Sequence, residues 1–297
     1  MKNWIVYIAF CFLVLSSCTK EITIVPKDYS EKLVVRSSLN SDSFIRVQVS
    51  KTNPISGSVS YSPVTDAIIN LYENGLLLGT LVHDVNGQYK IGLKPKIKKE
   101  YFIEVVSGDQ RCTAIDVLPD TVSVVSLKLD TVPFLSGQGF LQFTMEPSNI
   151  LNSKEFYEVS AFLEVREYIE LLGVIVDSID VIRAINLETI DPIILANANN
   201  KNYKEQYLIT DQALSLGTAI KFGTYDIKEL KGNEELKSIT IILRSMSEDA
   251  YNYYNSVYNQ IYYRSDPFSL PVKVQSNIQN GHGVFAGIQE SRVIVSF

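Results

Sequence analysis

The 297-residue sequence has few of the side chains on which catalytic and metal sites depend. It contains two histidines, His83 and His282, and three cysteines, Cys11, Cys18 and Cys112. A zinc site takes three or four ligands from histidine, cysteine and carboxylate, and the positions of the two histidines do not suggest such a set. A Gly-x-Ser-x-Gly nucleophile turn is also absent. The sequence therefore predicts no catalytic residues, no metal and no cofactor, and a protein that is not an enzyme.

Runs of basic residues are also missing, and the formal net charge of the chain is −6. Proteins that bind nucleic acid through its phosphates usually carry a basic patch or stripe. The acidic balance therefore argues against nucleic acid as a partner.

One uncharged apolar stretch, residues 4–15, lies close to the N-terminus and follows Lys2. It has the length of a signal-peptide core and is too short for a membrane-spanning helix, which needs about 20 residues. A Leu-Ser-Ser-Cys sequence that ends at Cys18 then matches the lipobox of bacterial lipoproteins. We therefore expect residues 1–17 to be a signal peptide, Cys18 to be the lipidated first residue of the mature protein, and residues 18–30 to be a tether.

A lipidated Cys18 would tether the protein to a membrane without spanning it. Each CH₂ group buried in the bilayer contributes about 0.8 kcal/mol to membrane binding, so two or three acyl chains such as palmitate anchor a protein stably. The second mature residue is not aspartate, which favours the outer membrane and leaves open whether the protein faces the periplasm or the cell surface. Processing at Cys18 also leaves Cys112 without an intramolecular partner, and we expect it to be a buried small hydrophobic residue.

Short segments with alternating apolar and polar residues begin at residue 31 and predict an all-β fold. About seven such segments precede Pro119, and Asn74-Gly75 suits the turn of a hairpin. We predict an Ig-like or transthyretin-like β-sandwich over residues 31–118.

Residues 119–297 are predicted to form a larger β-sandwich or barrel-like domain. Residues 155–170 could be helical, but apolar side chains alternate with charged ones there and favour a strand. Residues 185–202 are expected to form a long excursion. The predicted strands are 123–129, 140–145, 157–168, 174–182, 206–210, 219–222, 238–243, 271–275, 284–286 and 292–297.

One tyrosine-rich α-helix is predicted near residues 247–263, where six of the 17 tyrosines lie. Tyr254 and Tyr258 have the spacing of residues that face a core. The rigid ring and polar tip of tyrosine also suit a binding surface. The alternative is a helix packed on a sheet with tyrosines at its rim. The candidate ligand-binding residues are Tyr251, Tyr253, Tyr262 and Tyr263.

Several motifs follow the lipobox in one order. They are Val64-Thr65-Asp66-Ala67, Asn86-Gly87-Gln88-Tyr89, Ser276-Asn277-Ile278 and the glycine-rich block 280–287. In this order the chain resembles the DUF4249 family of Bacteroidetes lipoproteins, and residues 31–118 resemble the carboxypeptidase-regulatory sandwich. The resemblance implies an envelope lipoprotein that works beside a TonB-dependent outer-membrane transporter, and it implies no catalytic residues.

The sequence therefore predicts a non-enzymatic binding or accessory subunit of TonB-dependent nutrient uptake, anchored in the outer membrane by Cys18. Its expected partners are the membrane and a TonB-dependent transporter, and its ligand stays open. The alternative is an adhesin or a structural protein of the cell envelope.

Overall fold

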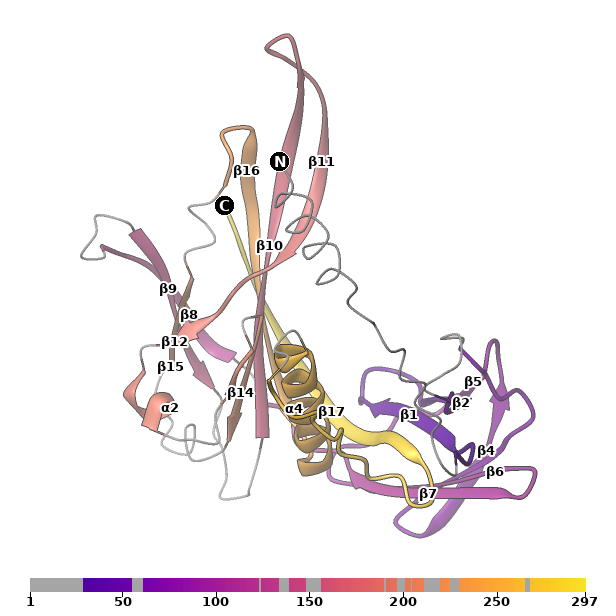
Figure 1. The fold of residues 1–297 in the computed structure, drawn as a ribbon. Helices are drawn as coiled ribbons and strands as arrows, with labels where there is room; N and C mark the ends of the chain where they lie inside the picture. The colour runs from indigo at the N-terminus through magenta and orange to yellow at the C-terminus, as the bar shows by residue number, and fades with distance from the viewer. Residues whose placement is uncertain are drawn as a thin grey trace, which may run out of the picture. The chain divides into compact units, whose positions relative to one another are not determined.

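The computed structural model describes residues 29–54, 61–122, 124–133, 139–147, 156–189, 191–196, 201–203, 205–210, 220–224, 230–264 and 268–297. The expected signal peptide, Cys18 and most of the tether lie outside these residues. Most of the described chain is strand, which confirms the all-β fold (Figure 1). No helix among the described residues is long and apolar enough to cross a membrane. Lys32–Thr52 and Tyr61–Phe297 form one compact unit.

The first seven strands form a sandwich-like layer around one apolar core. They are β1 (Leu33–Leu39), β2 (Arg46–Lys51), β3 (Ile68–Glu73), β4 (Leu76–His83), β5 (Gln88–Lys90), β6 (Glu100–Ser107) and β7 (Gln110–Val117). Their order in the sheet is β1-β2-β5-β4-β3-β6-β7. Val35 of β1 and Ala114 of β7 belong to the same buried cluster. The part of the sheet from β1 to β7 therefore curls until its first and last strands share one core.

Strand β17 (His282–Ser296) pairs with strands from both halves of the chain. Its first part pairs in parallel with β1, from His282 to Gly287. Its second part pairs antiparallel with β16 (Glu234–Met246), from Ile288 to Ser296. The predicted strands at 284–286 and 292–297 are therefore one strand, and the sandwich predicted for residues 31–118 includes a C-terminal segment.

The second half extends the same sheet and adds another. Strands β10 (Phe156–Leu171), β11 (Val174–Ala184), β13 (Lys201–Asn202) and β14 (Gln206–Thr210) continue beside β16. The second sheet contains β12 (Glu188–Thr189), β15 (Ile220–Thr224), β9 (Gly139–Pro147) and β8 (Val124–Pro133). The rings of Tyr207 and Phe222 lie 5.4 Å apart and join the two sheets. The helices among the described residues are α2 (Pro192–Ala196) and α4 (Glu248–Tyr263).

Strand β10 confirms the alternation read from the sequence, but both faces of its first six residues are covered. Tyr157, Val159 and Ala161 lie in the core between the sheets. Glu158 and Ser160 point the other way and are only 2% and 1% exposed. Helix α4 lies against that face of β10, so the polar residues Glu158 and Ser160 are buried as well.

Residues 271–275 form no strand, and that prediction is wrong. The segment follows α4, and the amide of Gln275 donates to the hydroxyl of Ser256 at 2.8 Å. The backbone is therefore bonded to a helix side chain at a point where a strand would bond to its neighbour.

The glycine-rich block allows β17 to approach β1. Gly283 has a φ of +111°, and a Cβ atom there would lie 2.0 Å from the carbonyl oxygen of Val35. A Cβ atom on Gly281 would lie 2.7 Å from the sulfur of Cys112. The side chain of Asn277 closes the turn, because it accepts from the amide of Phe285 at 3.0 Å and donates to its carbonyl at 2.7 Å.

Replacing Gly283 with alanine should lower the free energy of unfolding by about 3 kcal/mol, because the new methyl group adds strain and a backbone clash. Chemical denaturation of the mature chain measures this. Gly232 is the matched control, since nothing lies within 4 Å of a Cβ atom there, and Gly232→Ala should change the value by less than about 0.5 kcal/mol. Equal losses in the two variants would contradict this account.

Asp116, near the end of β7, holds β17 and α4 together. Its Oδ2 atom accepts from the amide of Gly287 at 2.8 Å and from the hydroxyl of Ser247. Ser247 in turn accepts from the amide of Ala250 at 3.1 Å and caps the helix. Burial raises the pKa of Asp116 to about 6, although the Ser247 and Gly287 donors partly oppose the shift.

Because the pKa of Asp116 in the folded chain lies above that of an unfolded aspartate, about 3.9, the folded state binds the proton more tightly. Its contribution to the free energy of unfolding is therefore greatest below pH 4 and should fall as the pH rises to about 6. Denaturation at several pH values, with Asp116→Asn as the reference, isolates this contribution. Identical pH profiles for the two proteins would show that Asp116 does not titrate in this range.

Candidate binding groove beside the tyrosine-rich helix

Helix α4 confirms the predicted helix and covers the outer face of β17. Ser247 provides the N-cap, and Glu248 and Asp249 place negative charge at the helix N-terminus, where it is favourable. Ala250 and Tyr251 pack in a cluster that includes residues of β17 and β10. The helix is thereby held beside β1, the parallel neighbour of β17.

The structure places the four candidate tyrosines in different surroundings. Tyr251 is buried and stacks on Phe156, with ring centroids 4.6 Å apart. Tyr253 is half-buried and meets the ring of Tyr254 edge-on. Tyr262 and Tyr263 lie together and exposed at the C-terminal end of the helix. The structure brings only this last pair together on the surface, and the binding role of all four stays a prediction.

Tyr254 and Tyr258, which the sequence pattern assigned to a core, pack against the cluster of Ala250 and Tyr251 and also line a cavity. The cavity has a volume of about 350 Å³ and is bounded by α4, β10, β16, β17 and the end of β1. Its charged lining residues are Glu158, Arg244 and Glu290.

These charged residues form a connected network beneath the helix. Arg244 bonds to Glu158 through Nη1 and to Glu290 through Nε, the latter at 2.8 Å. The hydroxyl of Tyr258 donates to Glu158 at 2.8 Å, and Arg292 also bonds to Glu290. Burial, together with the neighbouring Glu158 carboxylate, raises the pKa of Tyr258 well above its usual value. Tyr258 therefore keeps its proton and acts as a donor.

A second cavity of about 620 Å³ shares Ser38 with the first and lies on the outward face of β1 and β2. Arg36, Arg46 and Lys94 line it, and the Arg36 guanidinium lies beside the Tyr254 hydroxyl. We call the two cavities together the α4–β1 groove. Strand alternation places Arg36 and Arg46 outward, but nothing local in the sequence shows that they lie beside α4.

The two histidines and Cys112 lie in different surroundings. Nε2 of His83 accepts from the amide of Gly87 at 3.4 Å, and His282 is exposed at the start of β17. Cys112 is 1% exposed, and burial raises the pKa of its thiol, which confirms it as a buried small residue. Among the described residues, no three His, Cys, Asp or Glu side chains are grouped to hold a metal ion.

The β10–β11 hairpin presents a different kind of surface. The pairing of β10 with β16 ends at Glu167, and beyond that point only β11 pairs with β10. Leu172 and Gly173 have φ values of 54° and 79°, as a type I′ turn requires. We define the hairpin tip as residues 169–179. Its exposed apolar residues are Ile169, Leu171, Leu172, Val174, Ile175, Val176 and Ile179.

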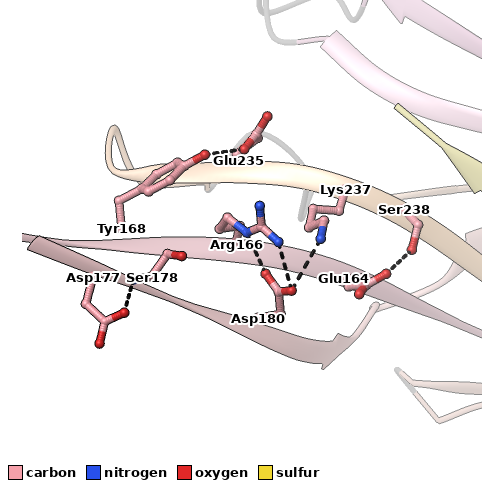
Figure 2. Close-up of polar contacts among 9 residues, drawn as sticks. All are labelled: Glu164, Arg166, Tyr168, Asp177, Ser178, Asp180, Glu235, Lys237 and Ser238. Carbon is pink, nitrogen blue, oxygen red and sulfur yellow. Dashed lines mark hydrogen bonds and ion pairs between the residues drawn. The ribbon is translucent and has the colours of Figure 1, made fainter. Parts of the chain in front are cut away.

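Polar contacts across three strands hold the base of this hairpin (Figure 2). Arg166 binds Asp180 through two nitrogens, at 2.8 and 3.1 Å, and Lys237 lies 3.3 Å from the same carboxylate. These cations lower the pKa of Asp180 to about 2. Arg183 bonds to both Glu167 and Glu234 at the same level. Bidentate pairs of this kind add geometric specificity, so a well-held base carries an apolar tip.

Replacing Arg244 with methionine should lower the free energy of unfolding by about 3 kcal/mol, because it leaves the carboxylate of Glu158 buried without a cation. Arg292→Met is the matched control, since Arg292 also bonds to Glu290 but is 63% exposed, and it should cost less than about 1 kcal/mol. Thermal or chemical denaturation measures both. Similar losses would show that burial of Glu158 does not decide the effect.

Residues 19–293 match the sequence model of a family described as "Domain of unknown function (DUF4249)". No curated protein matches the chain significantly. Among solved structures, a β-glucuronidase from Parabacteroides merdae is 11% identical with a TM-score of 0.21, over 73% of this chain and 23% of that one. The BSP domain of a biofilm-associated protein is 10% identical with a TM-score of 0.19, over 95% and 62%. The chain thus spans less than two thirds of either.

Proposed function

The chain belongs to the DUF4249 family, a family of unknown function, and on that premise we propose that it is a lipid-anchored, non-enzymatic accessory subunit of a TonB-dependent transporter at the outer membrane. The observation that carries this proposal is the hairpin tip, an exposed apolar surface on a chain whose sequence contains a lipobox. Soluble proteins rarely expose contiguous apolar surface unless it meets a partner.

The expected anchor supports a partner in the same membrane. Residues 18–30, fully extended, span about 45 Å at most. Acyl chains on Cys18 would therefore keep the folded unit within that distance of the membrane.

The charges around the tip favour a protein partner over the lipid surface itself. Glu170 and Asp177 are exposed within the tip, and acidic side chains are repelled by anionic lipid. An integral membrane protein can present an apolar contact without that repulsion, and a transporter fits this description.

A tip variant with Leu172→Asn, Val174→Thr and Val176→Thr should reduce transporter recovery at least tenfold when the tagged lipoprotein is purified from detergent-solubilised membranes. Asn-Gly suits the existing turn and threonine suits strands, so the hairpin should persist. Mass spectrometry of the co-purified proteins measures the result.

The control variant carries Leu76→Thr, Leu77→Thr and Val82→Thr on β4, where the side chains are 74%, 59% and 68% exposed. It should retain the transporter, and Cys18→Ala separates loss of the anchor from loss of the contact. A wild-type preparation without a transporter would overturn the proposal. Retention by the tip variant would show that the tip is not the contact.

A further inference from the structure

Three cations line the α4–β1 groove without forming an ion pair among the described residues. Within the described part of the chain, Arg36, Arg46 and Lys94 have no carboxylate at ion-pair distance. Lys90, beside Arg46 in the sheet, by contrast pairs with Asp84 at 2.8 Å. Asp42 is the one acidic residue that lines this part of the groove, so the local charge is positive on a chain that is acidic overall.

Sheet register places the two arginines on the same face and within reach of one ligand. Arg36 pairs with Gln48, and Arg46 lies two residues before Gln48 on β2. Such diagonal neighbours have Cα atoms about 7–8 Å apart. Two guanidinium groups at that spacing, with Lys94 lining the same cavity, match a ligand that carries more than one negative charge.

The other lining groups suit hydroxyls and the apolar face of a ring. Gln48 and Gln88 are adjacent across β2 and β5 and offer amide groups, and Ser38 offers a hydroxyl. Phe44 is 52% exposed in the same cavity. Aromatic rings beside amides and cations can stack on a sugar ring while polar groups bind its hydroxyls.

Two other anionic ligands fit the groove less well. A peptide that binds by adding a strand needs a free sheet edge, and β1, β2 and β5 each have a neighbour on both sides. A single phosphate needs fewer charges than this cavity offers, since Arg36, Arg46 and Lys94 line it from three separate segments of the chain.

We propose that the α4–β1 groove binds an acidic oligosaccharide, with Arg36, Arg46 and Lys94 contacting its carboxylates and with Phe44 and Tyr254 providing ring surfaces. This inference extends the proposed function by giving the subunit a ligand, and it does not require the transporter. Its test uses the purified protein alone, so its failure is distinguishable from failure of the transporter contact.

The test is titration calorimetry of the full mature chain in detergent with trigalacturonic acid and with its neutral methyl ester. The acid should bind, and the ester should bind at least tenfold more weakly. Arg36→Gln and Arg46→Gln should each weaken binding of the acid about tenfold, equivalent to about 1.4 kcal/mol. Both side chains are exposed, so the variants should fold, which denaturation midpoints would verify.

Arg111→Gln is the matched control, because it removes the same charge from β7, where Arg111 pairs with Glu104 outside the groove. It should leave binding unchanged. Equal binding of acid and ester, or equal weakening by Arg111→Gln, would overturn the proposal. Tighter binding of triglutamate would assign the groove to acidic peptides, and full displacement by millimolar inorganic phosphate would reduce it to a general anion site. Either result would also overturn the proposal.

Discussion

The close parallel pairing of β17 with β1 is the constraint on which the rest of the structure depends. A strand that begins in the first core and ends beside β16 ties both halves into one unit. That pairing is sterically possible because Gly283 has no Cβ atom to meet the Val35 carbonyl. The glycine-rich block that marks the family resemblance therefore has a packing explanation, and it needs no ligand to account for it.

The position of α4 follows from this pairing. Gly287 donates its amide to Asp116 and its carbonyl accepts from the amide of Ser247, so the last residue paired with β1 also fixes the start of the helix. Helix α4 then lies over β17 with Tyr254 and Tyr258 toward β1 and β10. The α4–β1 groove thus has walls from residues more than 200 positions apart, and it exists only when the C-terminal strand has joined the N-terminal sheet.

This long-range origin explains what the sequence could and could not predict. The strand class, the hairpin turns and α4 follow from local rules, and β10 is a clear case because Tyr157, Val159 and Ala161 alternate with polar residues. The same alternation predicts a solvated second face, and Glu158 is buried there because α4 covers it. The helical period correctly predicted that Tyr258 packs against a core, but it carries no information about the carboxylate of Glu158 on another element, to which Tyr258 donates. Local rules likewise predict that Arg36 and Arg46 point outward, but they do not predict that these residues lie beside α4.

The two sets of charges in the groove differ in what they can do for a ligand. Arg244 lies between Glu158 and Glu290, and Tyr258 and Arg292 bond to the same two carboxylates. These opposite charges neutralise one another within hydrogen-bond distance. They therefore form a well-held floor of the groove and contribute little to its net electrostatic potential. The potential beyond them is then set by Arg36, Arg46 and Lys94 against Asp42. Because a compensated floor cannot neutralise these cations, their charge remains available to an incoming anion, even on a protein whose overall charge is negative.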